Sequence, residues 1–426
     1  MHPREGWAED GPRRPGLSRR GFLRGTAGAG LVAGGLGPLL AACSSGTGGT
    51  AGTSGSAALP LPRPSHPVTW PIFADNKAIK SGLQPERGAT LKLYNWVAYI
   101  NEQVLKDFAK KYNVPVPQVT TFNTISEAMA KLRSGQLNFD VFFPTIDYMG
   151  QLVEGKLIQP LNHSYIPNIS QAWPDFTDPF YDGKWQYTVP YTIYTTGIAW
   201  RKDHVPQDPY TMANPWAMPW QAKYKGKVAI LDDYRESISL ALMKAGIYDL
   251  NTTSSAQIAA AGKSLQQLSA MTNVHIDNND YTEVPSGQIW IHHAWSGDMA
   301  TAASYMPKGV PVDVVGYWFP TDGKGPVGND TIAILKGAQS PVLAHLFLNY
   351  MIDTHNALNN YSYTGYMQPL TQITPQRLVA EGLLPKTLMS TTVLPSYFRR
   401  GVAELQLPVP TDVQWQQAWQ TVSHGA

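Results

Sequence analysis

Apolar segments alternate with amphipathic segments between residues 91 and 143. Leu91–Trp96 is a short apolar run typical of a buried strand, and Asn101 precedes a helix in which Val104, Leu105 and Phe108 share one face. The next strand, helix and strand are expected at 116–122, 125–134 and 139–143. This alternation predicts an α/β fold with a mostly parallel sheet and helices on both faces.

A second block with the same alternation follows. It is expected to contain strands at 227–231, 289–293 and 312–315 and helices at 236–245 and 256–268. Tyr191–Trp200 is predicted to cross from the first block to the second, and Thr331–Leu335 to return. Helices at 341–353 and 413–422 are then expected on the first block. Two lobes joined by two crossover segments form a cleft, where ligands meet the carboxyl ends of the strands.

The first ninety residues lack this alternation and predict export. Arg19 and Arg20 precede a weakly apolar run, Gly25–Ala42, which contains six glycines and Pro38 and is a poor membrane span. The arginine pair resembles a Tat export signal, and the last residues before Cys43 resemble a bacterial lipobox. We therefore expect a signal peptide at 1–42, lipidation of Cys43 and a flexible tether at 43–69. A chance arginine pair with a buried free cysteine is the alternative.

Charge and cysteine content exclude several classes of protein. The 426 residues have a formal net charge of +2, and residues 1–42 carry six arginines against three acids, or +3, so the remainder carries −1. Such a body lacks the basic surface that nucleic-acid binding requires. A single cysteine excludes intrachain disulfides, zinc clusters and iron–sulfur clusters.

No enzymatic centre is evident in the sequence. There is no G-x-S-x-G motif, and Cys43 lies in the leader. His292 and His293 are adjacent on a predicted strand and point to opposite faces, so they cannot hold one metal ion together. One of them is expected in the core and the other at the surface. Neither metal nor cofactor is predicted, although paired carboxylates leave a secreted carbohydrate-active enzyme as an alternative.

Acids and aromatic residues recur just after the predicted strands and within the return crossing. They are Trp96, Tyr99, Asp147, Asp233, Glu236, Trp295, Asp298 and Asp330. Aromatic walls with carboxylates suit an elongated cation, because each buried methylene contributes about 0.8 kcal/mol. An ammonium about 4 Å from a carboxylate contributes about 4 kcal/mol before desolvation, at an effective dielectric constant of about 20. The pattern favours an amine ligand.

Several motifs in this order are similar to those of the spermidine/putrescine-binding receptors of ABC importers. They are Leu93–Tyr99, Asp140–Thr145, Leu231–Glu236, Trp295–Asp298, Asp330–Ile334 and the pair Gly365–Tyr366. The resemblance extends from Leu91 to about Val422. It adds Tyr366 to the expected ligand-binding residues and implies that the ring of Trp295 stacks on the ligand and that Asp298 and Asp330 each bind an amine.

The resemblance implies a type II-like periplasmic-binding fold, with residues 90–195 and 332–426 as the first lobe and 196–331 as the second. It also implies a non-enzymatic, exported receptor with a polyamine ligand and an ABC permease and its ATPase as partners. We expect a monomer, held on the outer face of the membrane by the lipid on Cys43.

Three positions depart from the family pattern. Ala98 stands where family members commonly have an acidic residue, and Asp147 stands where they often have a stacking tyrosine. Gly328 stands where they have an aromatic residue. We hypothesise that Asp147 supplies the charge missing at Ala98. Another cationic amine or small solute remains an alternative ligand. Helix capping is an alternative role for Asp233 and Asp298, and a first-turn acid favoured by the helix dipole is one for Glu236. Trp96 and Trp295 have a place in the hydrophobic core as their alternative.

Overall fold

The computed structural model describes residues 60–135 and 138–423. Its strands are β1 (Lys92–Trp96), β2 (Gln118–Phe122), β3 (Val141–Phe142), β4 (Thr188–Arg201), β5 (Val228–Ile230), β6 (His275–Ile276), β7 (Ile291–Trp295), β8 (Val315–Trp318) and β9 (Val327–Ile334). Its α-helices are α1 (Glu102–Tyr112), α2 (Ile125–Arg133), α3 (Met149–Glu154), α4 (Tyr234–Lys244), α5 (Ser255–Thr272), α6 (Asp280–Ser286), α7 (Ser296–Ala300), α8 (Pro341–Met351), α9 (Thr354–Thr364), α10 (Pro375–Ala380), α11 (Pro395–Arg400) and α12 (Val409–Ser423).

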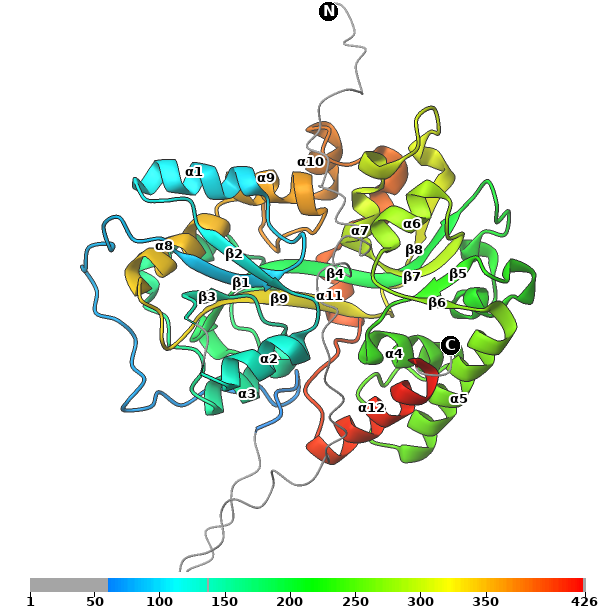
Figure 1. Ribbon diagram of the computed structural model, residues 1–426, viewed down its shortest axis with the longest axis horizontal. Coiled ribbons are helices and arrows are strands. Elements are labelled where there is room, and N and C mark those ends of the chain that lie inside the picture. Colours follow the sequence, from blue (N-terminus) through cyan, green and yellow to red (C-terminus); the bar gives the residue numbers. More distant parts are fainter. Residues whose placement is uncertain (1–59, 136–137, 424–426) are drawn as a thin grey trace, which may run out of the picture. The chain divides into compact units, whose positions relative to one another are not determined.

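Two long antiparallel strands connect the two halves of the sheet. The strand order is β2-β1-β3-β9-β4-β7-β5-β6, with β8 also paired to β4. Strands β1, β2 and β3 are parallel to one another, as are β5, β6 and β7, which confirms the two predicted blocks. β4 pairs with β9 through its first half and with β7 and β8 through its second half. Figure 1 shows β4 and β9 side by side between the blocks.

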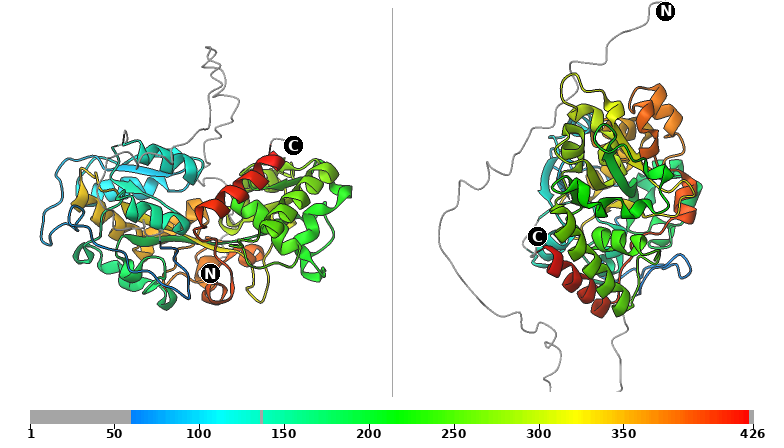
Figure 2. Two further views of the ribbon diagram at one scale, coloured as in Figure 1. Left: turned by 90° about the horizontal axis from the view of Figure 1, so that it is seen from below. Right: turned by 90° about the vertical axis from the view of Figure 1, so that its right-hand side faces the viewer.

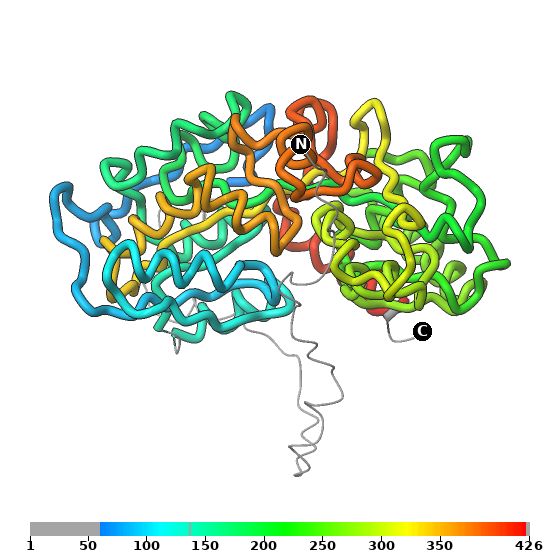
Figure 3. Tube along the Cα trace, turned by 90° about the horizontal axis from the view of Figure 1, so that it is seen from above, coloured from blue at the N-terminus to red at the C-terminus, as the bar shows by residue number. Residues whose placement is uncertain are grey.

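The buried apolar side chains form two clusters: the larger fills the first block and extends into the second through Ala294, Met299 and Tyr317, and the smaller lies at the second block. The larger contains Leu93, Phe142 and Leu348, and the smaller contains Ile230 and Leu265. In Figure 3 the blue-to-teal and gold segments gather together, apart from the green segments. The gold segment is α8 and α9, so the chain returns to the first block after β9, as predicted.

Helix starts in the first block follow the predicted caps. The side chain of Asn101 accepts a hydrogen bond from the backbone N–H of Gln103 at the start of α1. At the start of α2, Thr124 accepts from the N–H of Glu127 at 3.2 Å, and the Glu127 carboxylate accepts from the N–H of Asn123 at 3.4 Å. The bond from Glu127 N–H to Thr124 confirms one half of the predicted capping box, whereas the Glu127 carboxylate reaches the N–H of Asn123, one residue before the cap.

The prediction that the last helix packs on the first block is wrong. α12 packs against α4 and α5 of the second block, which Figures 1 and 2 show in red beside green helices. Trp415 is fully buried in the smaller cluster, and its indole N–H donates to the carbonyl oxygen of Thr252 at 3.2 Å. The apolar face of α12 therefore closes the second core, and residues 332–426 do not all belong to the first lobe.

The predicted flexible tether ends earlier than expected. Trp70 is 2% exposed and donates through its indole N–H to the carbonyl oxygen of Tyr181 at 2.8 Å, and the Arg63 side chain donates to the carbonyl oxygen of Gln406 at 2.7 Å. The backbone N–H of Val68 also donates to the carbonyl oxygen of Phe180 at 2.8 Å, so residues 60–69 contact the body, although most of them are exposed. The predicted signal peptide and Cys43 lie outside the described residues. Within the described residues, no helix is both long and apolar enough to cross a membrane.

Two local expectations are also wrong. His292 and His293 are both fully buried, because β7 lies inside the sheet and both of its faces are covered. The strand expected at 312–315 starts only at Val315, since Val312–Val314 forms a 3₁₀ turn after Pro311.

Candidate functional site

Asp330 lies on β9 where the two crossing strands meet the first block. Its backbone pairs with Thr192 of β4. The Tyr99 hydroxyl donates to Asp330 Oδ2 at 2.6 Å and lies 2.5 Å from the Thr192 hydroxyl. The other carboxylate oxygen, Oδ1, is buried and has no hydrogen-bond donor among the described residues. Asp330 therefore has one oxygen that is held by the protein and one that is available to a cationic ligand.

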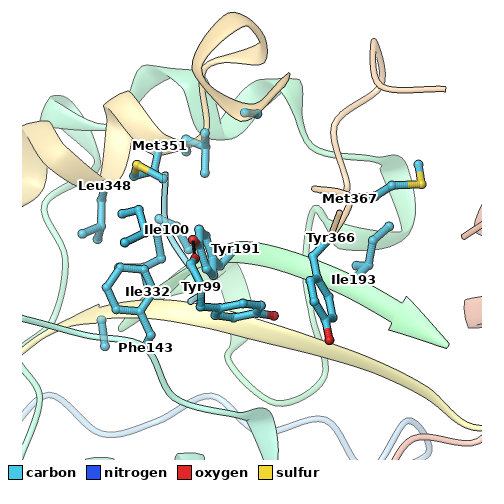
Figure 4. Close-up of a cluster of buried hydrophobic side chains, with 14 of the residues drawn as sticks. Tyr99, Ile100, Phe143, Tyr191, Ile193, Ile332, Leu348, Met351, Tyr366 and Met367 are labelled. Carbon is cyan, nitrogen blue, oxygen red and sulfur yellow. Dashed lines mark hydrogen bonds between the residues drawn. The ribbon is translucent and has the colours of Figure 1, made fainter. Parts of the chain in front are cut away.

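Aromatic rings line the space beside Asp330. Tyr99 and Tyr366 meet edge to face with ring centroids 5.0 Å apart, as Figure 4 shows, and Tyr366 meets Tyr194 at 6.1 Å. Gly297 faces Tyr366 closely, since a Cβ there would lie 2.4 Å from the ring. A side chain at Gly297 would displace the ring, so this glycine permits α7 to pack against Tyr366.

The second block contributes Glu236 and Trp295. Glu236 Oε1 accepts from the indole N–H of Trp295 at 2.8 Å and from the Thr196 hydroxyl at 2.9 Å. Glu236 Oε2 is buried and has no donor in the described part of the chain. Its environment matches that of Asp330, since one carboxylate oxygen is fixed by hydrogen bonds and the other accepts none from the described residues.

Burial raises the pKa of the Asp330 and Glu236 carboxyls to about 7. The charge of Asp147 also raises the pKa of Asp330, and the charge of Asp233 also raises that of Glu236. The titratable side chains near Asp330 are Asp147, Tyr99, Tyr181, Tyr191, Tyr194 and Tyr366. Those near Glu236 are Asp233, Arg235, Glu404, Tyr194 and Tyr317. A bound ammonium would offset the cost of ionising each carboxyl.

The raised pKa values predict that the ligand-free protein loses stability as pH rises. The unfolded chain releases these protons near pH 4, but the native protein retains them to about pH 7. The native state therefore binds more protons across this window, and the free energy of unfolding falls by up to about 1.4 kcal/mol per pH unit for each carboxyl. Urea unfolding at a series of pH values should show a shallower decline for Asp330→Asn than for the wild type; parallel curves would contradict the prediction.

Trp96 and Asp233 make contacts that stabilise their own block. Trp96 is fixed within the first block: its indole N–H donates to the carbonyl oxygen of Phe143 at 3.0 Å, and its ring packs on Phe122. Asp233 is the N-cap of α4 and accepts from the backbone N–H groups of Arg235 and Glu236, which confirms the capping alternative. Its charge nevertheless acts on Glu236 and Asp147.

Asp147 and Asp298 lie beside other acids. Asp147 is half-buried in a 3₁₀ turn after β3, and burial raises its pKa to about 6. Asp298 is buried in the first turn of α7 and interacts with Asp280; burial and this like charge hold the pKa of Asp280 well above its usual range. Asp298 also acts on Tyr366, which places it near the aromatic wall.

Sequence reasoning missed Asp280, Tyr194 and Glu404. Tyr194 of β4 lies across from Gly328, where a Cβ would lie 2.3 Å from its ring. The aromatic residue missing at Gly328 is therefore replaced in space by Tyr194, a substitution that the expected β4–β9 pairing could have indicated. Glu404 accepts from the Ser239 hydroxyl of α4, and no local motif marks it.

Residues 103–381 match the bacterial extracellular solute-binding protein family. The chain belongs to this family. The spermidine/putrescine-binding periplasmic protein of Escherichia coli (strain K12) is 30% identical over 283 residues, which are 66% of this chain and 77% of the relative. The putrescine/cadaverine-binding protein of Pseudomonas aeruginosa is 28% identical over 280 residues, or 65% of this chain and 78% of the relative.

The family membership confirms the resemblance and the two-lobe fold. The TpPotD lipoprotein of Treponema pallidum aligns with a TM-score of 0.66 at 23% identity, covering 78% of this chain and 99% of the other. Solute-binding proteins of ABC transporters are exported and are not enzymes, so the carbohydrate-active alternative is excluded. They deliver a solute to a permease that is driven by an ATPase.

Proposed function

We propose that this solute-binding protein captures a polyamine, such as putrescine or spermidine, between its two lobes. The observation that carries the proposal is a pair of buried carboxylate oxygens that have no donor among residues 60–135 and 138–423: Asp330 Oδ1 on the crossing strand and Glu236 Oε2 on the second lobe. Two separate carboxylates match the two ammonium ends of a diamine. The rings of Tyr99, Tyr366 and Trp295 offer apolar surface to the methylenes between those ends.

In this proposal the ligand joins the lobes. Tyr194 experiences the charges of Asp330, Asp147, Glu236 and Glu404, so acids from both lobes surround one ring. A dication bound among them lowers their mutual repulsion. Ligand binding therefore favours the closed conformation, in which both lobes contact the ligand.

Isothermal titration calorimetry of the ligand-free protein tests the proposal. Putrescine and spermidine should bind and raise the melting temperature. The matched control is 1,4-butanediol, which has the same carbon chain as putrescine but no charge and should not bind. Binding of a different amine with no response to either polyamine would favour the other-amine alternative. Equal binding of butanediol and putrescine would contradict the proposal.

Asp147 is proposed to supply first-lobe negative charge in place of Ala98. It is half-buried, and its charge acts on Asp330 and on Tyr194. Asp147→Asn should weaken putrescine binding about tenfold, equivalent to about 1.4 kcal/mol. The control is Asp175→Asn, which removes a first-lobe acid that pairs with Arg399 at the surface. Unchanged affinity in Asp147→Asn, measured by calorimetry, would refute this role.

We further propose that Cys43 carries the lipid that holds the protein on the outer face of the cytoplasmic membrane, where it meets its permease. The support is the sequence Leu40–Cys43 after a twin-arginine leader. Cys43→Ser should move the protein from the membrane fraction to the soluble exported fraction of expressing bacteria, as detected by immunoblotting, without changing putrescine affinity. Retention of Cys43→Ser in the membrane fraction would oppose lipidation at this residue.

A further inference from the structure

Three potential metal ligands converge on the second lobe, apart from the carboxylates assigned to the polyamine. Asp277 follows β6, Glu283 lies on α6, and His292 lies on β7. Each side chain offers one ligand atom, and the three atoms lie within 4.8 Å of one another. Residues from three separate elements thus meet at one point.

His292 is oriented for coordination. It is 0% exposed and sits in the sheet between Ala199 of β4 and Ala229 of β5. Its Nδ1–H donates to the carbonyl oxygen of His293 at 2.6 Å, because a carbonyl can only accept. In the neutral ring, Nε2 therefore carries a lone pair. A backbone carbonyl bound to one ring nitrogen is the usual arrangement behind a metal-bound histidine.

The free nitrogen of His292 faces a carboxylate. Nε2 is buried and has no hydrogen-bond partner within the described residues, and Asp277 Oδ1 lies 3.8 Å away, too far for a hydrogen bond. A lone pair directed at a carboxylate is electrostatically unfavourable in a buried site unless a cation or a proton lies between them.

Both carboxylates are also held in place. Asp277 Oδ1 accepts from the backbone N–H of Asn279 at 2.7 Å. Glu283 Oε1 accepts from the side-chain amide of Gln288 at 3.0 Å, whereas its Oε2 is buried without a donor in the part of the chain described. Fixed ligands of this kind lose little entropy on binding a metal ion, which favours a built site.

We propose that Asp277, Glu283 and His292 form a site for a divalent transition-metal cation of the Zn²⁺ class. One imidazole nitrogen with two carboxylate oxygens is a ligand set typical of Zn²⁺. Ligand atoms around tetrahedral Zn²⁺ lie about 3.4 Å apart, so small side-chain shifts close the observed spacing. His293 points to the other face of β7 and takes no part, which agrees with the rule that adjacent histidines on a strand cannot share a metal.

The cation would fix α6 to β7. α6 has seven residues, contains Pro285 and has no side-chain N-cap, so it is a weak helix by itself. Its first residue, Asp280, accepts from the backbone N–H of Trp295 at 3.2 Å. The metal site and Trp295 are thus held by the same two elements, and the cation has a structural role.

The test is Zn²⁺ binding to the full-length chain without a histidine tag, after removal of metal with a chelator and in the absence of polyamine. Zn²⁺ should raise the melting temperature of the wild type, and Co²⁺ should give visible absorption bands from an ordered site. Glu283→Gln retains the size of the side chain and its contact with Gln288. It should weaken Zn²⁺ binding at least tenfold and abolish the Co²⁺ bands, with little change in the circular dichroism of the metal-free protein.

The matched control is His355→Gln, which removes an exposed imidazole on α9 and should retain Zn²⁺ binding at wild-type affinity. If Zn²⁺ does not stabilise the wild type, or if Glu283→Gln binds Zn²⁺ as tightly as the wild type does, the metal site is refuted. A proton between His292 Nε2 and Asp277 would then be the occupant. Failure of putrescine to bind has no bearing on this result, because the two sites use different side chains.

Discussion

Asp330→Asn should weaken putrescine binding about 100-fold, equivalent to about 2.7 kcal/mol. The exchange removes the charge of a buried carboxylate whose Oδ1 has no donor among the described residues. The asparagine carbonyl oxygen can still accept the hydrogen bond from the Tyr99 hydroxyl. Calorimetry above about pH 8, where the carboxyl would be ionised, measures the full effect of the lost charge.

The unfolding temperature of the ligand-free Asp330→Asn variant shows whether the variant is folded. Removal of a buried carboxylate relieves a desolvation cost, so above about pH 8 the ligand-free variant should unfold at or above the wild-type temperature. The surface variant Asp175→Asn should match the wild type in both affinity and stability. Wild-type putrescine affinity in a well-folded Asp330→Asn protein would eliminate Asp330 as a ligand group.

Glu236→Gln should weaken putrescine binding by about 30- to 100-fold, equivalent to about 2 to 2.7 kcal/mol. The glutamine carbonyl oxygen can keep the hydrogen bonds from Trp295 and Thr196, while its amide presents a donor to the ammonium in place of Oε2. The binding enthalpy and dissociation constant, again measured by calorimetry, should both reflect one lost charge pair.

The double variant distinguishes two separate contacts from one shared contact. If each carboxylate binds a different ammonium, the free-energy losses of Asp330→Asn and Glu236→Gln should be nearly additive for putrescine. The second-lobe control is Asp203→Asn, since Asp203 is an exposed acid that pairs with Arg201. A double variant no weaker than either single variant would indicate that both carboxylates act on the same end of the ligand.

Local sequence signals predicted most elements of the fold. The caps at Asn101 and Thr124, the apolar run before Trp96 and the long crossing segment around Tyr191 depend on neighbours within a few residues, and all four occur as expected. The position of α12 depends instead on which distant helices have an open apolar groove. The sequence of α12 contains no information about that groove, so its assignment to the first lobe failed.

The hydrogen-bond partners of the carboxylates in the candidate site could not be predicted from neighbouring residues in the sequence either. Asp330 and Glu236 were selected from motifs. The feature that matters is that each has one oxygen fixed by Tyr99 or Trp295 and one that meets no donor in the part of the chain that the structure describes. That difference arises from contacts between residues far apart in sequence. The capping of α4 by Asp233 was predictable as an alternative, because it depends only on the next three residues.

The return of α12 to the second lobe determines when that lobe can finish folding. Residues 196–331 alone lack the helix that covers α4 and α5, so a fragment cut at these boundaries would expose the surface that Trp415 covers. During synthesis the same surface stays uncovered until α12 leaves the ribosome. Completion of the second core therefore waits for a helix that follows the lobe's other elements by about ninety residues, however early the crossing strands have formed.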